Sequence, residues 1–208
     1  PTNYIIIGSN HNNLGSEFAV MKEGLWKTPL GEVVVNSRMA QKIIDKSKIV
    51  EYDVVAHENE HSIEVQIPFL QYRFGNDFKF VPITIINSYA NDDFLKRCVA
   101  VGKAIADAIK TDKENWTIIA TSDFSHNSKE ASKRIDKNLV ESMKNLNGKK
   151  LFDATVKHNA HICGLGALIT SLAAAKGLGA KNAELLKYSS SFAVTQDPDS
   201  VTGYASLI

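Results

Sequence analysis

Three runs of apolar, mostly β-branched residues constrain the fold of this chain more than any other feature. They are NYIIIG (3–8), FKFVPITII (78–86) and WTIIAT (116–121). Strands that are apolar at nearly every position are typical of parallel sheets, in which both faces are buried. The sequence therefore predicts a central, largely parallel sheet that is covered on both sides.

A helical pattern follows the second of these runs. Residues 91–110 begin with Asn91 as the expected N-cap and two aspartates in the first turn, where negative charge stabilises a helix. Apolar residues then recur at helical spacing along one stripe, which includes Cys98. We expect Cys98 to be a core residue. The members of the stripe are Phe94, Cys98, Val101, Ile105 and Ile109.

Two further helices are predicted in the second half of the chain. Residues 129–146 carry an apolar residue at every fourth position, and their other face is rich in Lys and Glu. Residues 164–179 form a mostly apolar segment that is expected to end at Gly177 or Gly179.

The tail returns to strand-like sequence in SFAVT (191–195) and VTGYASLI (201–208). Apolar strands that alternate with helical segments indicate an α/β fold. We therefore predict a layered α/β/α architecture with a mostly parallel central sheet.

Composition narrows the class of protein further. The chain has 208 residues, of which 44% are hydrophobic and 23% are charged, as expected for one globular domain over residues 1–208. Its 24 basic and 23 acidic residues are balanced, so the electrostatic signature of a nucleic-acid or anionic-membrane partner is lacking. A small-molecule or protein partner is expected instead.

The sequence also bears on location. No apolar run approaches the ~20 residues of a membrane span, and PTNYIIIGSN lacks the pattern of a signal peptide, so a cytoplasmic protein is predicted. Two cysteines in different contexts make a disulfide framework improbable. Because the chain starts without Met and enters a strand almost at once, we expect an N-terminal piece of the natural protein to be missing.

Ligands of open α/β sheets bind at the carboxyl ends of the strands. His11 follows the first predicted strand, and Asp123 and His126 follow the strand at 116–121. An aspartate three residues before a histidine can fix its tautomer and raise its basicity, as a general base or metal ligand requires. These side chains are candidates for a site, although a lone His in a polar loop is often only solvated.

Cys163 immediately precedes the predicted helix at 164–179, which opens with Gly164 and Gly166. Helix N-terminal amides favour a thiolate, and glycines permit another group to approach the backbone closely. Cys163 is therefore a candidate nucleophile or soft metal ligand, and the alternative is a small buried apolar residue at a helix start. His158 and His161 flank it and are weaker candidates.

The pentapeptide HENEH (57–61) matches the zinc-protease pattern H-E-x-x-H, which requires both histidines on one helix. The preceding residues IVEYDVVA look strand-like, and the helical stripe begins only at Ile63. We expect the helix to start near Glu60 and His57 to lie before it. No third metal ligand follows His61 at a metzincin spacing. The match is therefore interpreted as a coincidence. The overlapping segment EHSIE (60–64) remains of interest.

Taken in order, GSNHNN, TPLGEV, EHSIEVQIPFLQ, SDFSH and HICGLGALITSLAAAKGLG resemble the Memo family of archaeal, bacterial and eukaryotic proteins over nearly the whole chain. The resemblance implies the fold of class III extradiol dioxygenases, which are non-haem iron enzymes. It also implies reduced copper or iron as the bound metal, and a radical-SAM protein as a partner of microbial members.

The resemblance also assigns residues. The positions that match the family's metal pocket are His11, Asp123, His126 and Cys163, whereas the family's H-A-G-Y motif has no counterpart in this chain. His61 and Glu64 belong to the family's EHSxE motif. They are expected on the first turn of a helix at the pocket rim, as supports of the ligands or as substrate contacts.

Two hypotheses about function follow. The first is a metal-dependent redox protein in which His11, His126 and Cys163 hold iron(II) or copper(I), and His126 acts as acid and base with Asp123 orienting it. A thiolate in place of a carboxylate shifts metal preference, so ring-cleaving dioxygenase chemistry does not follow from the fold. The alternative is a non-catalytic module that binds a peptide or an anion in the same pocket.

Overall fold

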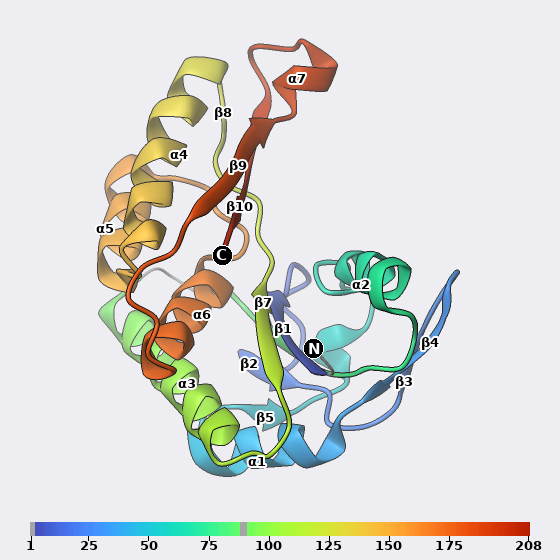
Figure 1. Cartoon of the computed structure of the whole chain (residues 1–208). Helices are drawn as coiled ribbons and strands as arrows, with labels where there is room; N and C mark the ends of the chain where they lie inside the picture. The colour runs from blue at the N-terminus through green and yellow to red at the C-terminus, as the bar shows by residue number, and fades with distance from the viewer. Residues whose placement is uncertain (1–2, 88–90) are drawn as a thin grey trace.

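The computed structural model describes residues 3–87 and 91–208, and its main sheet is built around the first predicted strand (Figure 1). Strand β1 (Asn3–Ser9) lies between β6 (Lys79–Ile85) and β7 (Trp116–Ala120) and is parallel to both. The three apolar runs thus form neighbouring parallel strands, which confirms the predicted mostly parallel sheet.

Shorter strands extend the sheet beyond β6. Strand β4 (Gly31–Val35) is parallel to β6, and β3 (Leu25–Thr28) forms an antiparallel hairpin with β4. Strand β2 (Phe18–Val20) is antiparallel to β6 and parallel to β5 (Glu51–Tyr52). The path across the sheet is β3-β4-β6-β1-β7.

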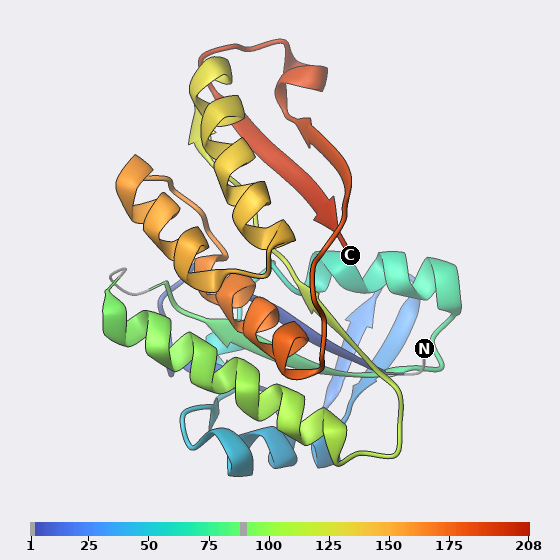
Figure 2. The ribbon, with the colours of Figure 1, turned by 60° about the vertical axis from the view of Figure 1, so that its left-hand side comes forward.

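Helices cover both faces of this sheet, as the layered α/β/α prediction requires (Figures 1 and 2). Helices α1 (Ser37–Ser47), α3 (Asp92–Lys110) and α6 (Leu165–Gly177) contribute to the core on one face, and α2 (Ile67–Phe74) lies on the other. Ile5 and Ile7 of β1 belong to the first core and Tyr4 and Ile6 to the second, because successive side chains of a strand point to opposite faces. The strand is buried on both faces for this reason.

A second, antiparallel sheet of order β8-β10-β9 stands beside the first, with α4 (Lys129–Lys144) and α5 (Gly148–His158) packed next to it (Figure 1). Its strands are β8 (His126–Asn127), β9 (Leu185–Ser190) and β10 (Val201–Leu207). The strand predicted at 201–208 and the helix predicted at 129–146 are thereby confirmed. Helix α5 was not predicted; Asn147 caps its N-terminus and Asn159 ends it in the left-handed conformation.

The helix predicted at 91–110 is confirmed in detail. The Asn91 side chain accepts a hydrogen bond from the amide of Phe94 at 2.8 Å, which is the expected N-cap contact. Cys98 is fully buried, as predicted, and burial raises the pKa of its thiol to about 12. This cysteine is a structural residue. Helix α6 ends at Gly177, which was one of the two predicted ends.

Two predictions about local structure are wrong. Residues 191–195 form the one-turn helix α7 (Phe192–Thr195) rather than a strand, because this segment closes the connection between β9 and β10. Helix α2 begins at Ile67 rather than near Glu60, since Pro68 has no amide hydrogen and is tolerated in the first turn of a helix but not in its interior. The residues between form a turn and the 3-10 helix Glu64–Gln66.

Helices α3 and α6 approach closely because Gly102 faces the backbone of α6. A Cβ atom built at Gly102 would overlap the carbonyl oxygen of Thr170 and would crowd the side chain of Ala173. The hydroxyl of Thr170 also donates to the carbonyl oxygen of Cys98, which lies one turn earlier on α3. The two helices therefore pack backbone against backbone at Gly102, where there is no room for a side chain.

The substitution Gly102→Ala should consequently destabilise the protein. Alanine favours a helix over glycine by about 1 kcal/mol, but an overpacked helix contact costs about 1–3 kcal/mol, and here the clash is with backbone that cannot rotate away. We expect a net loss in the free energy of unfolding, measured by urea denaturation. A rise in stability would show that α3 and α6 are not in this contact.

A buried carboxylate ties the ends of three elements together. Asp112 follows α3, and its side chain is fully buried by Arg38 and Lys42 of α1, which both form ion pairs with it. It also accepts hydrogen bonds from the amide of Glu114 and from the indole of Trp116 on β7. The Arg38 guanidinium is the main reason that the pKa of the Asp112 carboxyl lies well below its usual range.

The substitution Asp112→Asn should therefore cost about 2 kcal/mol of stability near neutral pH, because several charge-assisted hydrogen bonds are lost. A carboxyl whose folded pKa is lowered stabilises the folded state above its unfolded pKa of about 4, and this contribution is lost as the pH falls further. Urea midpoints of the two proteins should differ at pH 7 and converge at pH values below about 4. A difference that stays constant with pH would contradict this role.

The exposed pair of Lys149 and Asp153 provides a control for this experiment. Both side chains are more than half exposed, so solvent and salt screen their attraction. Asp153→Asn should leave the urea midpoint unchanged at every pH.

Candidate functional site

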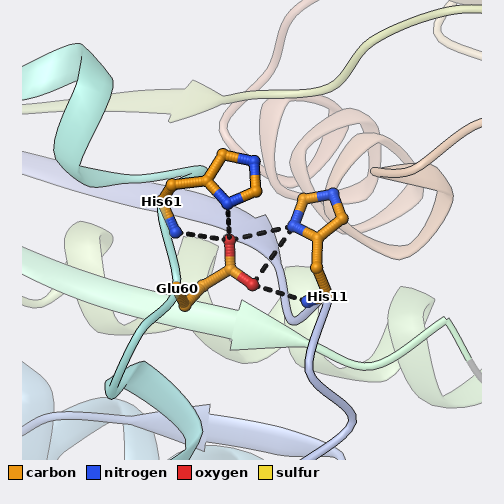
Figure 3. Close-up of side chains that lie close together, drawn as sticks. All are labelled: His11, Glu60 and His61. Carbon is orange, nitrogen blue, oxygen red and sulfur yellow. Dashed lines mark hydrogen bonds and ion pairs between the residues drawn. The ribbon is translucent and has the colours of Figure 1, made fainter.

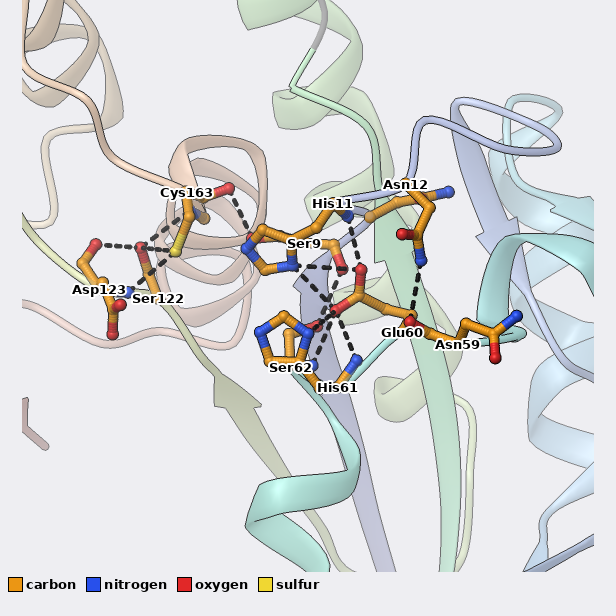
Figure 4. A network of polar contacts seen from close by, with 12 residues as sticks. Ser9, His11, Asn12, Asn59, Glu60, His61, Ser62, Ser122, Asp123 and Cys163 are labelled. Carbon is orange, nitrogen blue, oxygen red and sulfur yellow. Dashed lines mark hydrogen bonds and ion pairs between the residues drawn. The ribbon is translucent and has the colours of Figure 1, made fainter.

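The predicted site edge exists, because the carboxyl ends of β1, β6 and β7 meet at one edge of the main sheet. The last residue of β1, Ser9, and the loop residue His11 lie there, and the segment after β7 brings Asp123 (Figure 4). The Ser9 hydroxyl donates to the carbonyl oxygen of Cys163 at 2.5 Å, which links the first loop to the start of α6. Three of the predicted residues, His11, Asp123 and Cys163, therefore gather in one region.

The centre of this region is a buried carboxylate that was not predicted. The side chain of Glu60 is 2% exposed, and it accepts hydrogen bonds from the backbone amides of His11 at 2.5 Å and of His61 and Ser62 at 2.8 Å each. It also bonds to Nδ1 of His11 at 2.9 Å and lies 3.6 Å from Nδ1 of His61 (Figure 3). One carboxylate thus fixes two histidines from different loops.

The two imidazoles are held in a common orientation. Their ring centroids are 4.6 Å apart and the planes are inclined by 21°, so the rings are stacked. Because Glu60 engages Nδ1 of His11, the neutral ring carries its proton there and leaves Nε2 as a free lone pair. In Figure 4, Nε2 of both rings points toward the side on which Ser122, Asp123 and Cys163 are drawn.

This geometry suits metal binding. A histidine that ligates a metal commonly gives its other ring nitrogen to a carboxylate, which fixes the ring and strengthens the ligand. Within residues 3–87 and 91–208, His11, Glu60 and His61 form a group whose potential ligand atoms all lie within 4.8 Å of one another. The arrangement can hold a cation either through the two imidazoles alone or with the carboxylate.

The Glu60 carboxyl is ionised in the folded protein. Burial by itself would raise its pKa, but the amides of His11 and Ser62 and the His11 imidazole outweigh burial and lower the pKa below its ordinary value. A negative charge is therefore fixed behind the two histidines, where it makes both rings better ligands for a cation.

Cys163 occupies the turn that starts α6, and its surroundings are polar. Its sulfur accepts a hydrogen bond from the amide of Asp123 at 3.1 Å and lies 3.8 Å from the hydroxyl of Ser122. That hydroxyl also accepts from the amide of Gly164 at 2.9 Å. Two elements, the β7 loop and the start of α6, are thereby joined at the thiol (Figure 4).

The turn itself is clamped from a third strand. The Asn87 side chain, just after β6, donates to the carbonyl oxygen of Cys163 and accepts from the amide of Gly166 at 3.2 Å. A Cβ atom at Gly164 would overlap Ser122, and one at Gly166 would crowd Ile85. Both glycines are therefore required for close approach, as the sequence predicted.

His126 is less closely tied to the centre than expected. It lies on β8, half-exposed, with Nδ1 3.0 Å from the hydroxyl of Thr202 on β10. Its Nε2 is 3.9 Å from a carboxylate oxygen of Asp123, at the outer limit of an ion pair. Asp123 and His126 are thus adjacent, but among the described residues neither of them, nor Cys163, belongs to the cluster of His11, Glu60 and His61.

The two histidines of the HENEH segment lie in different places, His57 in the core and His61 at the site. His57 is buried in the 3-10 helix Val55–His57, where Nδ1 lies 3.0 Å from the carbonyl oxygen of Asp53 and the ring meets the edge of Trp26. Burial lowers the pKa of His57, so the ring is neutral. His61 instead faces Glu60. The two histidines do not share a helix, and the zinc-protease geometry is excluded, as expected.

Of the remaining predicted residues, His61 belongs to the central cluster, whereas Glu64 and His158 lie outside it. His61 precedes the helix instead of lying on its first turn, and it contacts the site directly through Glu60. Glu64 is exposed and opens a 3-10 helix; with Trp26, Lys27 and Glu60 it lines a cavity of about 500 Å³. His158 ends α5 and is not part of the metal-type cluster.

Fold and site define a class: a layered α/β protein in which imidazole, carboxylate and thiol groups lie at the carboxyl ends of the parallel strands. The family model described as "Memo-like protein" matches residues 1–208. The chain belongs to the Memo family. The α/β fold, with its mainly parallel central sheet, is consistent with the class III extradiol dioxygenase-like architecture expected from the resemblance.

Relatives support this assignment. The chain is 41% identical over 206 residues to a MEMO1 family protein of Methanosarcina mazei, covering 99% of this chain and 74% of the relative. It is 37% identical over 209 residues to one of Methanopyrus kandleri, covering 100% and 72%. A MEMO1 family protein of Desulfurococcus amylolyticus is 38% identical over 208 residues, covering 100% and 71%.

A solved structure supports the fold alone. The crystal structure of an uncharacterized protein of Escherichia coli K12, JW3007, superimposes with a TM-score of 0.55 at 18% identity, covering 96% of this chain and 84% of the other. Separately, none of the helices in the part of the chain that the structure describes has the length and apolar character to cross a membrane.

The role of Glu60 can be tested by Glu60→Gln. This change keeps the shape of the side chain but replaces one acceptor oxygen by a donor that faces backbone amides. Nitrogen-15 NMR at about pH 8.5, where an ordinary imidazole is neutral, should show His11 protonated at Nδ1 in the unaltered protein and mixed tautomers in Glu60→Gln.

Glu64→Gln is the matched control, because Glu64 is an exposed carboxylate four residues further along the chain. It should leave the His11 signals unchanged. Mixed tautomers of His11 in the unaltered protein would show that Glu60 does not orient this ring.

Proposed function

We propose that this protein binds a redox-active transition metal, iron(II) or copper(I), through Nε2 of His11 and His61 and the thiolate of Cys163. The observation that carries the proposal is the single buried carboxylate of Glu60, which holds both imidazoles by their Nδ1 side and turns their Nε2 atoms the same way. The assignment of His61 as a ligand differs from the sequence expectation, in which it supported the site from the rim.

The donor set fits such a metal. Imidazole nitrogens bind copper, iron and zinc, and a thiolate adds preference for softer ions such as copper(I). The contact of the Cys163 sulfur with the Asp123 amide leaves its other lone pairs available. Three protein ligands of this kind would leave room on such a metal for water or a substrate, as in oxygen-activating iron proteins.

The bound metal would supply one-electron redox chemistry, and the chain's own residues would manage protons and position. Asp123 and His126 stand together at the edge of the region, and His126 is exposed enough to exchange a proton with a substrate or with water. Glu60 would keep its negative charge and hold the imidazoles, and Ser122 and Asn87 would hold the turn of Cys163. We propose a cytoplasmic location, where the thiol remains reduced, and a radical-SAM protein as partner.

A second function is favoured by the exposure of the region. The side chain of His61 is 63% exposed, and those of Asp123 and His126 are about half exposed, so a peptide or an anion could reach them. In that case the same pocket would bind its ligand without a metal. Chelators distinguish the two functions, because they would abolish the first and leave the second unchanged.

Element-resolved metal analysis of anaerobically purified protein tests the proposal. The unaltered chain should hold stoichiometric iron or copper, and Cys163→Ser and His61→Ala should each weaken its affinity by about tenfold or more, since each removes a ligand. The fold should persist, because both residues are partly exposed.

His158→Ala serves as the control, since His158 lies at the end of α5 outside the cluster, and it should retain the metal. Absence of iron and copper from the unaltered protein, together with ligand binding indifferent to chelators, would favour the binding module. Zinc retained by all variants would contradict both assignments.

A further inference from the structure

Helices α3, α5 and α6 lie side by side (Figure 2), and a cavity of about 410 Å³ that no residue of the candidate site lines is found where they meet. The three helices pack against one another in pairs, and the cavity opens where they converge. Its floor is apolar: Ile169 and Leu146 are buried there, and Val99 and Ala173 are half-buried. A volume of this size falls in the range of small-molecule pockets.

Several of the residues that line the cavity are small. Gly148 of α5, Ala173 of α6 and Gly177 at the end of α6 all line it. Helices α3 and α6 are held close together by the contact at Gly102, and the connection between α4 and α5 adds Leu146 and Asn147 to the lining.

Its rim is cationic. Lys103 comes from α3, Lys149 from the first turn of α5 and Lys176 from the last turn of α6, so three separate helices each supply one ammonium group. Lys149 forms an ion pair with Asp153. The hydrogen bond to Asp153 and the negative charge of Asp92 both raise the pKa of Lys149. Among the residues that the structure describes, Lys103 and Lys176 form no ion pair.

Two helix ends lie at the cavity and act in opposite senses: the C-terminus of α6 at Gly177 carries partial negative charge, whereas the N-terminus of α5 carries partial positive charge. The amides of Gly148 and Lys149 precede the first hydrogen bond within α5, which Leu151 donates to the carbonyl of Asn147. The first turn of α5 also contains no acidic residue. Partial positive charge from a helix N-terminus therefore faces the same region as the lysines.

An apolar floor with a cationic rim favours a ligand that has an apolar part and an anionic group. We propose that this cavity binds a small amphipathic anion, an apolar chain or ring that carries a phosphate or a carboxylate group. The apolar part would lie on Ile169 and Ala173, and the anionic group would meet Lys103 and Lys176. This site is independent of the metal pocket, which begins at the opposite end of α6.

Calorimetric titration with octyl phosphate tests this proposal, with octyl glucoside and inorganic phosphate as probes that each lack one of the two characters. Octyl phosphate should bind more tightly than either. In the double variant K103Q/K176Q its dissociation constant should rise by about fivefold or more, since two attractive charges are lost. Both lysines are exposed, so the variant should fold.

The matched control is K110Q/K157Q, which removes the same charge from α3 and α5 at positions outside the cavity. It should leave the dissociation constant unchanged. Equal weakening of octyl phosphate binding in both double variants would overturn the proposal, because binding would then depend only on the net charge of the protein. Octyl glucoside or inorganic phosphate binding as tightly as octyl phosphate would overturn it as well, as would no binding of octyl phosphate at millimolar concentration.

Discussion

The burial of β1 on both faces is the constraint on which the rest of the structure depends. A strand that is apolar at successive positions must be covered from two sides, and here α3 and α6 cover one face while α2 covers the other. Because β6 and β7 are both parallel to it, three chain segments leave the sheet at the same edge. The ends of β1 and β7 therefore lie close together, and the turn before α6 joins them through the contacts of Cys163 with Ser9 and Asp123.

The site is built on this edge from two preorganised halves. In one half, Glu60 fixes His11 and His61 through backbone amides and ring nitrogens together. In the other, Ser122 and Asn87 hold the turn of Cys163. The bond from Ser9 to the Cys163 carbonyl connects the halves. Buried polar groups that are satisfied in this way keep the ligand atoms in place, so little ordering is required when a ligand binds.

Much of this could be predicted from the sequence, for identifiable reasons. The apolar strands and the stripe of α3 carry strong periodic signals. Strand ends direct attention to His11 and Asp123, and the start of a helix directs attention to Cys163. Glu60 was missed because nothing in its local sequence indicates that a glutamate among charged residues will be buried; its partner His11 is 49 residues away. The start of α2 was predicted wrongly because Pro68 outweighs the apolar pattern. Residues 191–195 were predicted wrongly as a strand because tertiary context determines their structure.

We propose above all that two imidazoles and one thiolate, from three separate segments of the chain, share one metal ion. X-ray absorption spectroscopy of the protein loaded anaerobically with iron(II) or copper(I) tests it most directly, because the first shell distinguishes sulfur from nitrogen and oxygen. The predicted spectrum shows one sulfur and two imidazole nitrogens, with the sulfur contribution lost in Cys163→Ser. A first shell of nitrogen and oxygen only, the same in both proteins, would contradict the claim.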